Sequence, residues 1–457
     1  MNSHASPSRV DAPSGKGVGT PKRAAIGSMV GSSLEWYDFF LYGTAAALVI
    51  GPLFFPHGDG SLVSTLQAFA TFTVGFIARP FGGVIFGHFG DRLGRQRMLV
   101  ITLMLMGVAT ALIGVLPTYE QAGVLAPALL VLLRIVQGIA VGGEWGGAVL
   151  LVSEHAERRR GFYTSFSQVG IMTGFVLSAG VFALVTRLPD DQLLTWGWRI
   201  PFLISIVLTI VGLIIRHKVE ETPAFKAVQE AGTTHRYPVM EALRRHPREI
   251  AVTIGARMAE NGGSYIFLVF ALAYGAHLGL DATMLLMAAI VGNIVEIGMV
   301  VFWGSLSDRI GRRPVYLIGA VSVVVWAVPF FALIQTGQTV NVFIAMIVAL
   351  GLCHGAMIGS QPTFFSELFQ GEVRYSGITI GHELAAIFAG GIAPLIATSL
   401  LAAYGTYWPI ALYLAVLGVI TTIAVAVAPE TLHRGHGSGA DRESSSDQAQ
   451  AREVSDA

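Results

Sequence analysis

The feature that most constrains this chain is a series of apolar runs, each long enough to cross a lipid bilayer as a helix. Such a helix needs roughly 20 residues for a hydrocarbon core of about 30 Å. The runs fall near residues 24–48, 62–88, 98–117, 123–151, 161–187, 199–216, 249–276, 283–303, 314–335, 341–365, 375–401 and 407–428. Only 13% of the 457 residues are charged, which is too few for a soluble chain of this length. The sequence therefore predicts an all-α membrane protein with twelve transmembrane helices.

Lysine and arginine are distributed unevenly over the predicted loops. Of 29 such residues, three lie within spans, two lie in loops on one side (Arg187 and Arg199), and the remaining 24 lie in the tails and loops on the other side. Because cytoplasmic loops carry the excess of positive charge, we expect both termini in the cytoplasm. The predicted organisation is a disordered tail (1–22), a six-helix bundle (23–216), a cytoplasmic linker (217–247), a second six-helix bundle (248–430) and a second disordered tail (431–457).

Two loop sequences recur in the two halves of the chain. "GHFGDRLGRQR" at 87–97 matches "GSLSDRIGRRP" at 304–314, an offset of 217 positions. "SEHAERRRGFYTSF", which begins at Ser153, has its counterpart in "SELFQGEVRYSGI", which begins at Ser366. Two duplicated loops in register predict a parallel repeat of two six-helix bundles, related by an axis along the membrane normal.

Two acids lie inside the first apolar run. Gly27, Gly31, Glu35, Asp38 and Tyr42 follow one another at spacings of four, four, three and four, which places them on one face of a helix. Neither carboxyl group is close enough to the membrane surface to reach the headgroups, so both must face protein or a water-filled cavity.

Within the predicted spans, acids outnumber arginines. The acids are Glu35, Asp38, Glu144, Glu260, Glu296 and Glu383, and the arginines are Arg79, Arg134 and Arg257. Burying an unpaired carboxylate costs several kcal/mol, so some of these acids should carry protons part of the time. Desolvation favours the neutral carboxyl and a nearby arginine favours the charged one, so a cavity that opens to alternate sides can load and release a proton. Glu35, Asp38 and Glu144 are our candidates for proton coupling, with Arg134 as the neighbour that sets their proton affinity; a purely structural bond between helices is the alternative.

Opposite charges also occupy equivalent positions of the repeat. Adding the offset to Arg79 on the second span gives Glu296 on the eighth. His382 and Glu383 lie at a similar depth on the eleventh span, and the family resemblance described below implies that this span faces the second. We therefore predict a contact between Arg79 and Glu383 that joins the two halves in some conformations.

The duplicated loop carries the pattern Gly-x-x-x-Asp-Arg-x-Gly-Arg, and in this the chain resembles the major facilitator superfamily. More narrowly, "LEWYDFFLYG", "ARPFGGVIFGHFGDRLGR", "RIVQGIAVGGEWGGA" and "WGWRIPF" are similar to the metabolite:proton symporter family, in particular its shikimate-permease type. The resemblance implies that two bundles rock about a cavity lined by the first, fourth, seventh and tenth helices, in a bacterial inner membrane. That type usually lacks acids at the positions of Glu296 and Glu383, which leaves the substrate open.

The resemblance and the polar residues of the spans together give two further groups of candidates. The substrate-binding candidates are Tyr42, Arg79, Arg134, Gln137, Arg257, Glu260, Asn261, His354, Gln361 and His382. The gating candidates are Gly87, Asp91, Arg92, Arg95, Gly304, Asp308, Arg309, Arg312, Glu296 and Glu383. Asp91 and Asp308 sit at predicted helix ends, where a carboxylate can face the positive N-terminus of a helix in the opposite bundle.

These features favour a proton-coupled secondary transporter that imports a small organic acid, such as shikimate or a dicarboxylate. Proton symport of proline or betaine, and proton-driven efflux of a drug or metabolite, stay open as alternatives. An enzyme is not expected, because no span pairs metal ligands or places a serine motif beside a base. With Cys353 as its single cysteine, the chain forms no internal disulfide. We expect a monomer in contact with lipid, solute and protons, with no cofactor, metal or nucleic acid.

Overall fold

The structure is a computed structural model that describes residues 21–55, 62–93, 95–142, 149–150, 152–153, 155–156, 158–216, 243–369 and 374–432. The first half contains α1 (Pro21–Ala45), η1 (Ala46–Ile50), α2 (Gly51–Phe54), α3 (Leu62–Leu93), α4 (Arg95–Val115), α5 (Tyr119–Ala122), α6 (Leu125–Val141), α8 (Arg160–Val185), α9 (Asp190–Gln192), η2 (Leu193–Gly197) and α10 (Arg199–Arg216). The second half contains α13 (Pro247–Tyr265), η3 (Ile266–Phe270), α14 (Ala271–His277), α15 (Ala282–Ile310), α16 (Arg312–Gln335), α17 (Thr339–Val348), η4 (Ala349–His354), α18 (Gly355–Leu368), α19 (Arg374–Ala385), η6 (Ala386–Gly391), α20 (Ala393–Tyr404) and α21 (Trp408–Val427). The η elements are π-helical turns, most of which join two α-helices into one span.

Each predicted span overlaps a helix of the described residues, and the end of the fourth span, 143–148 and 151, lies outside them. Eight of these helices are long and apolar enough to cross a bilayer, and a bent pair, 190–197 with 199–214, supplies a ninth. The apolar parts of α4 and α6 are shorter, and the segment from α13 to α14 has several charged residues in its sequence. Together they form the twelve helices of the predicted all-α membrane fold. No β-strand occurs in the ranges given above.

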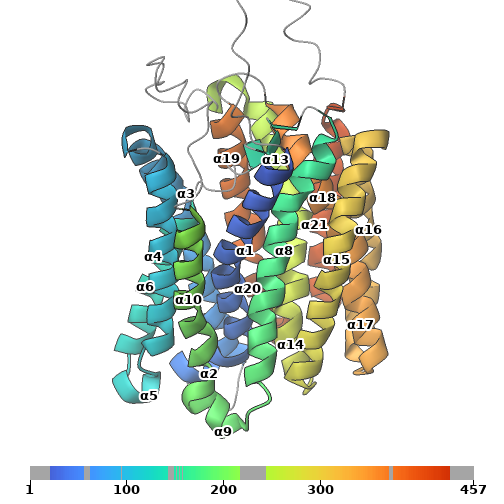
Figure 1. Ribbon diagram of the computed structural model, residues 1–457. Helices are drawn as coiled ribbons and strands as arrows, with labels where there is room; N and C mark the ends of the chain where they lie inside the picture. Colours follow the sequence, from blue (N-terminus) through green and yellow to red (C-terminus); the bar gives the residue numbers. More distant parts are fainter. Residues whose placement is uncertain are drawn as a thin grey trace, which may run out of the picture.

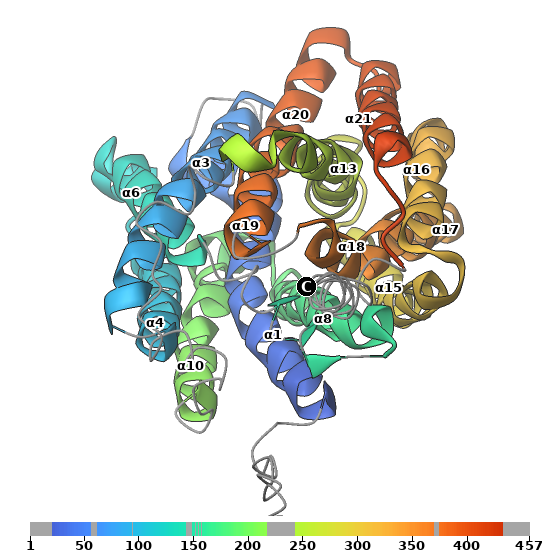
Figure 2. The same ribbon diagram turned by 90° about the horizontal axis from the view of Figure 1, so that it is seen from above.

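The helices form two bundles that lie side by side (Figures 1 and 2). We call the end at which α1 begins, at the top of Figure 1, the upper end. Helix α8 of the first bundle packs along α15 of the second, and α3 packs against η6 and α20. These two helix pairs form the junction between the halves, and the cavity described below lies between them.

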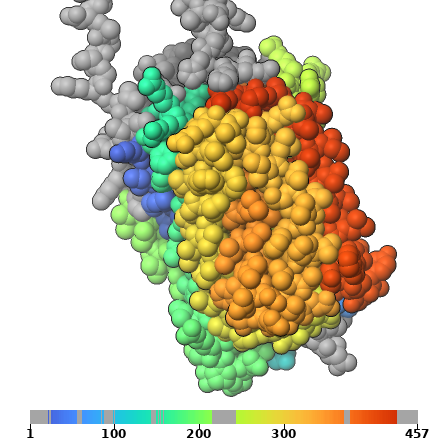
Figure 3. Space-filling view, turned by 90° about the vertical axis from the view of Figure 1, so that its right-hand side faces the viewer, coloured from blue at the N-terminus to red at the C-terminus, as the bar shows by residue number. Residues whose placement is uncertain are grey.

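The outer surface of the second bundle is apolar. Val325 of α16, Val340 of α17 and Ile423 of α21 are among its exposed side chains. Figure 3 shows this face, which the yellow, orange and red helices cover over its full height. An apolar surface of this extent is suited to the hydrocarbon core of a bilayer, where there is no hydrophobic penalty for exposing it.

Glycine allows α6 to pack closely on α3. A Cβ atom on Gly138 would overlap the carbonyl oxygen of Gly75, and one on Gly142 would overlap the carbonyl oxygen of Arg79. Small residues let two backbones approach in this way in membrane helices. Arg79 of α3 and Arg134 of α6 are both buried, and their guanidinium carbons lie 5.4 and 5.6 Å from the ring centre of Phe39.

The two bundles touch at both ends of the molecule. At the upper end, Ser153 Oγ lies 3.1 Å from Ser366 Oγ, and Thr164 Oγ1 lies 2.6 Å from Thr363 Oγ1. At the lower end, the hydroxyl of Thr186 at the end of α8 lies 3.4 Å from that of Thr283 at the start of α15. The space between the bundles is therefore bounded above and below by contacts between them.

Candidate functional site

A cavity lies between the bundles at mid-height. Its volume is about 20 Å³, which is room for about one water molecule, so the bundles are closely packed around it in this structure. Five spans line it, with Trp36, Phe40, Gln168, Ile171, Met172, Arg257, Glu260, Asn261, Ser264, Tyr265, Leu268, His354, Ile358, Gln361 and His382. The first bundle contributes mainly apolar and aromatic side chains, and the second contributes the charged ones.

Arg257 is the cation of this cavity. Its Nη2 lies 3.7 Å from Glu260 Oε2, one turn further along α13, and its Nη1 donates to Gln361 Oε1 of α18 at 3.2 Å. Gln361 Nε2 in turn donates to the hydroxyl of Tyr316 at 3.1 Å. Arg257 and Glu260 are both buried. A guanidinium held in this way can bind a carboxylate through two parallel hydrogen bonds.

His354 connects Glu260 to a deeper acid. Its Nε2 lies 3.6 Å from Glu260 Oε1, and its Nδ1 is hydrogen-bonded to Glu296 of α15. Glu296 is one of our gating candidates, and its contact with His354 lies within the second bundle. The imidazole between two carboxylates can accept a proton at one nitrogen and release it from the other.

Asp38 is buried on α1, and its Oδ1 has no hydrogen-bond partner within the described part of the chain. Thr110 of α4 is a polar neighbour of the carboxyl group, and its hydroxyl donates to the carbonyl oxygen of Met106 at 2.8 Å. Gln137 Nε2 donates to Thr110 Oγ1 at 2.7 Å, and Arg134 Nη1 donates to Gln137 Oε1 at 2.8 Å. Gln137 and Thr110 therefore lie between Arg134 and Asp38.

The guanidinium of Arg134 is stacked on aromatic rings. Its Cζ lies 3.9 Å from the ring centre of Tyr42, and its Nη2 donates to the carbonyl oxygen of Phe72 at 3.4 Å. Tyr42 is itself hydrogen-bonded to Thr71. Cation–π contacts of a desolvated arginine contribute about 2 kcal/mol. They keep Arg134 behind the aromatic layer, so it does not line the cavity.

Arg79 joins the two bundles. Its Nε lies 2.8 Å from Glu383 Oε2 of α19, and His382 Nδ1 lies 2.9 Å from Glu383 Oε1. The Arg79 guanidinium also packs against the rings of Phe39 and Phe76, each with its centre 5.4 Å away. The contact between Arg79 and Glu383 predicted from the repeat is confirmed.

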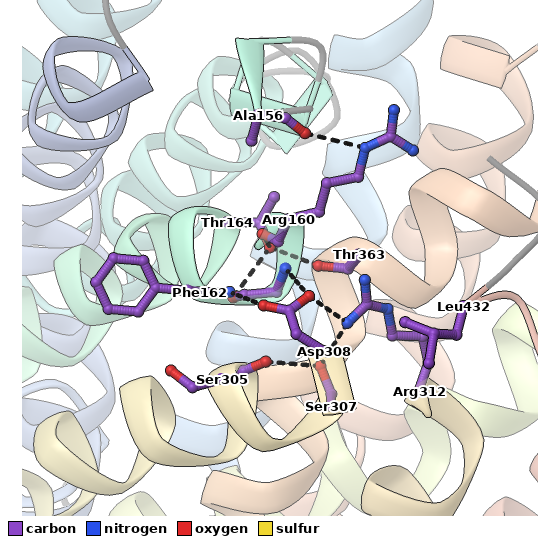
Figure 4. Close-up of polar contacts among 12 residues, drawn as sticks. Ala156, Arg160, Phe162, Thr164, Ser305, Ser307, Asp308, Arg312, Thr363 and Leu432 are labelled. Atoms are coloured by element: carbon purple, nitrogen blue, oxygen red, sulfur yellow. Dashed lines mark hydrogen bonds and ion pairs between the residues drawn. The ribbon is translucent and has the colours of Figure 1, made fainter. Parts of the chain in front are cut away.

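Asp308 makes the second polar junction, at the upper end (Figure 4). Its two carboxylate oxygens accept hydrogen bonds from the backbone N–H groups of Gly161 at 2.9 Å and Phe162 at 3.0 Å, at the start of α8. Arg312 Nη1 lies 2.6 Å from Asp308 Oδ1, and Arg312 also bonds Glu367 of α18. The predicted placement of the Asp308 carboxylate at a helix N-terminus of the opposite bundle is confirmed.

The other gating candidates differ in what the structure describes of them. Gly304 lies against Gly161 across the bundle junction, and Arg309 lies in the last turn of α15. Gly87, Asp91 and Arg92 lie within α3 and Arg95 starts α4, but their side chains are outside the described set. Glu144 also lies outside the described residues, as does most of the predicted linker.

The predicted substrate residues divide into two groups. Six of the ten line the cavity: Arg257, Glu260, Asn261, His354, Gln361 and His382. The other four lie in the surrounding layer: Tyr42, Arg79, Arg134 and Gln137. Glu35, a proton-coupling candidate, is half-buried on α1 and does not line the cavity either. The sequence analysis missed Gln168 of α8, although an amide in the middle of an apolar run is a signal that could have identified it.

Both halves of the chain match known families of transporters. Residues 24–236 match the family model described as Sugar (and other) transporter, and residues 252–452 match the model of the Major Facilitator Superfamily. The shikimate transporter of Escherichia coli (strain K12) is 44% identical over 401 residues, which cover 86% of this chain and 91% of that protein. The proline/betaine transporter of the same strain is 35% identical over 430 residues, with 91% and 85% covered.

Solved structures show the same fold. The xylose transporter XylE from E. coli, in a partially occluded inward-open conformation, superposes with a TM-score of 0.69 at 18% sequence identity. The alignment covers 90% of this chain and 98% of that one. A structure of a D-xylose-proton symporter gives the same TM-score at 20% identity. The chain therefore belongs to the major facilitator superfamily, as a multi-pass secondary transporter of the membrane.

Proposed function

We propose that this protein imports a small organic acid, of the shikimate or dicarboxylate class, together with protons. The observation that carries this proposal is the cavity between the bundles, in which Arg257 is the one arginine or lysine of the described lining, next to Glu260, two histidines and aromatic and amide side chains. The transport takes place by alternating access in a bacterial inner membrane, with the upper end in the cytoplasm. The protein acts as a monomer surrounded by lipid.

The cavity lining suits a hydroxylated carboxylic acid. Arg257 offers a bidentate partner for the carboxylate. Both amide atoms of Gln168 and Oδ1 of Asn261 are buried and have no hydrogen-bond partner within the described chain, so they are available for hydroxyl groups. Trp36 and Tyr265 line the cavity with ring surfaces that can cover an apolar ring of the solute. Leaving buried amides without a partner costs about 1–3 kcal/mol each, which a hydroxylated solute recovers on binding.

Proton coupling is supported by the charges around Asp38. When Asp38 is ionised, its negative charge offsets the positive charge of Arg134, and Thr110 and Gln137 lie between the two groups. When Asp38 binds a proton, Arg134 is left without a balancing charge in a low-dielectric layer. An anionic solute in the neighbouring cavity restores the balance, so the proton and the solute favour each other's binding.

Alternating access is supported by the two polar junctions. Arg79 with Glu383, and Asp308 with the start of α8, hold the bundles together in this structure. All of these bonds cross from one bundle to the other, so they must break when the bundles separate. Their polar partners are then exposed to water, which compensates for part of the loss.

Proline or betaine uptake is a second candidate function. Glu260 and the rings of Trp36 and Tyr265 line the same cavity, and aromatic rings bind quaternary ammonium groups. The proline/betaine transporter named above is a relative at 35% identity. An efflux cycle would use the same residues with the solute moving outward.

Uptake into proteoliposomes tests these functions against one another. Purified protein is reconstituted, an inward proton gradient is imposed, and labelled shikimate, succinate, citrate, proline and betaine are supplied outside. The proposal predicts that the gradient accelerates uptake of at least one acid and of neither zwitterion. Gradient-driven uptake of betaine alone would favour the second candidate. Uptake of every acid at the same rate with and without the proton gradient would refute the proposed function. Extrusion of a preloaded acid against its own concentration gradient would show efflux.

A further inference from the structure

The second bundle contains a histidine between two carboxylates that the proposed function does not use. His354, at the end of η4, is hydrogen-bonded through Nδ1 to Glu296 of α15, and its Nε2 lies 3.6 Å from Glu260 Oε1 of α13. The relative exposures of His354, Glu296 and Glu260 are 1%, 0% and 4%. Three spans thus contribute one titratable group each to a buried triad, Glu296–His354–Glu260.

The charges of the second bundle balance only when the Glu296–His354–Glu260 triad holds a proton. Glu260 is paired with Arg257 at 3.7 Å, and Glu383 is paired with Arg79 at 2.8 Å. Glu296 has neither arginine as a partner, so with a neutral His354 it would be a buried negative charge, which costs several kcal/mol. One proton shared between Glu296 and His354 removes that charge.

This proton has a route to the cavity. His354 and Glu260 line the cavity, whereas Glu296 lies behind them. The imidazole presents one nitrogen to each carboxylate, which is the arrangement of a proton shuttle. Glu296 Oε2 and both amide atoms of Asn293, one turn earlier on α15, are buried without a hydrogen-bond partner in the described chain. Polar atoms of this kind can be satisfied by water next to the pair.

The triad also contacts the proposed solute site directly, because Glu260 is paired with Arg257. In this structure Arg257 is shared between Glu260 and Gln361. A solute carboxylate that binds Arg257 competes with Glu260 for the guanidinium. Of the ionisable neighbours that Glu260 then has, Tyr265, Tyr316 and His354, only the imidazole can carry a positive charge, so a proton on His354 stabilises Glu260. Binding of an anion at Arg257 and protonation of the Glu296–His354–Glu260 triad therefore favour each other.

No other ionisable group next to the triad, among the described residues, supplies the positive charge that this proton supplies. Tyr316 of α16 accepts from Gln361, and His382 of α19 is hydrogen-bonded to Glu383. Cys353 precedes His354 and is buried. Helices α8 and α17 also pack on α15, but α17 has no ionisable side chain and those of α8 lie in its first turn, at the upper end.

We propose that Glu296, His354 and Glu260 form a second proton-binding site, so that two protons accompany each solute molecule. One proton binds here and the other binds at Asp38. The inference rests on the proposed proton-coupled transport and specifies its stoichiometry. Among the buried charged groups of the described residues, Asp38 offsets Arg134 when it is ionised, whereas Glu296 is offset only by a proton on the Glu296–His354 pair.

The solute gradient at zero net flux measures the stoichiometry. Proteoliposomes are held at zero membrane potential with potassium and valinomycin, and a pH difference of about one unit is imposed. The probe is labelled shikimate, or the acid of the panel above that is transported. Two protons per solute sustain a solute gradient of about 100-fold, and one proton sustains about 10-fold, because each proton contributes about 1.4 kcal/mol per pH unit.

Substitutions then locate the second proton. Glu296→Gln and His354→Gln should each lower the zero-flux gradient from about 100-fold to about 10-fold. Solute counterflow at equal pH on both sides checks that each variant is folded and binds solute. The matched control is Glu249→Gln, the same substitution at a partly exposed position in the first turn of α13, which should leave the gradient at about 100-fold.

The outcomes separate this inference from the proposed function. A wild-type solute gradient that does not change with the imposed pH difference refutes proton coupling altogether. A wild-type gradient of about 10-fold leaves the proposed function standing and overturns the second site, even if neither variant can be purified. A gradient of about 100-fold that persists in Glu296→Gln or His354→Gln places the second proton elsewhere and also overturns the inference.

Discussion

Substituting Gly161 by alanine should weaken the closure of the upper end. A Cβ atom at Gly161 would overlap the carbonyl oxygen of Gly304 and lie 2.7 Å from Ser307 Oγ, both on α15 of the other bundle. These contacts exist only while the bundles are together, so the open state escapes the clash. Overpacking of this kind costs about 1–3 kcal/mol, which corresponds to a shift of about 5- to 150-fold toward the state open at the upper end.

Hydrogen–deuterium exchange measures this shift at the junction itself. The N–H groups of Gly161 and Phe162 donate to Asp308, so they exchange when the bundles separate. In Gly161→Ala, peptides covering the start of α8 should exchange about 5- to 150-fold faster than in the wild type. The matched control is Gly180→Ala on the same helix, where an added Cβ meets no atom within 4 Å.

Two results would refute this reasoning. One is wild-type exchange at the start of α8 in a Gly161→Ala protein that is folded. The other is an equal acceleration in Gly180→Ala, which would show that a general change of helix α8 is responsible. Because both variants replace glycine by alanine within α8, their difference in helix propensity cancels.

Three further substitutions test the cavity and the junction. Arg257→Ala should raise the KM for an acidic solute by about 10- to 150-fold, since it removes a hydrogen-bonded charge; unchanged initial rates at low concentration would contradict its role. Gln168→Leu should weaken uptake of a hydroxylated acid more than uptake of an unhydroxylated one, by about 1–3 kcal/mol, and equal effects on both would be evidence against an amide–hydroxyl contact. Arg79→Ala leaves Glu383 buried without its cation, so it should abolish transport and lower stability by about 3–5 kcal/mol. Adding Glu383→Gln should restore the thermal unfolding temperature but not transport, and wild-type uptake by Arg79→Ala would remove the junction from the mechanism.

The fold was predictable because its main determinant is one-dimensional. The length of an apolar run decides whether it can span a bilayer, and every predicted run lies on a helix of the structure. The repeat added spatial information. It marked Arg79 and Glu296 as equivalent positions, and the family resemblance implied that Glu383 lies on the span facing Arg79; the structure has Arg79 and Glu383 2.8 Å apart.

The cavity was less predictable because side-chain direction depends on packing across helices. Arg134 shares a span with Gln137, but the ring of Tyr42 lies 3.9 Å from its guanidinium and keeps it out of the cavity. The repeat marked Glu296 as the equivalent of Arg79 but gave no partner for it, and in the structure a π-helical turn of the same bundle presents His354 to it. Neither the aromatic stack nor the π-turn has a signature in residue spacing.

Solute-evoked proton movement is the most direct test of proton-coupled import. Lightly buffered, de-energised proteoliposomes receive the transported acid outside, and the external pH is recorded together with solute entry. Proton-coupled import predicts that the medium becomes alkaline as solute enters, and that Asp38→Asn reduces the protons taken up per solute molecule. Solute entry without any alkalinisation in the wild-type protein would contradict the account.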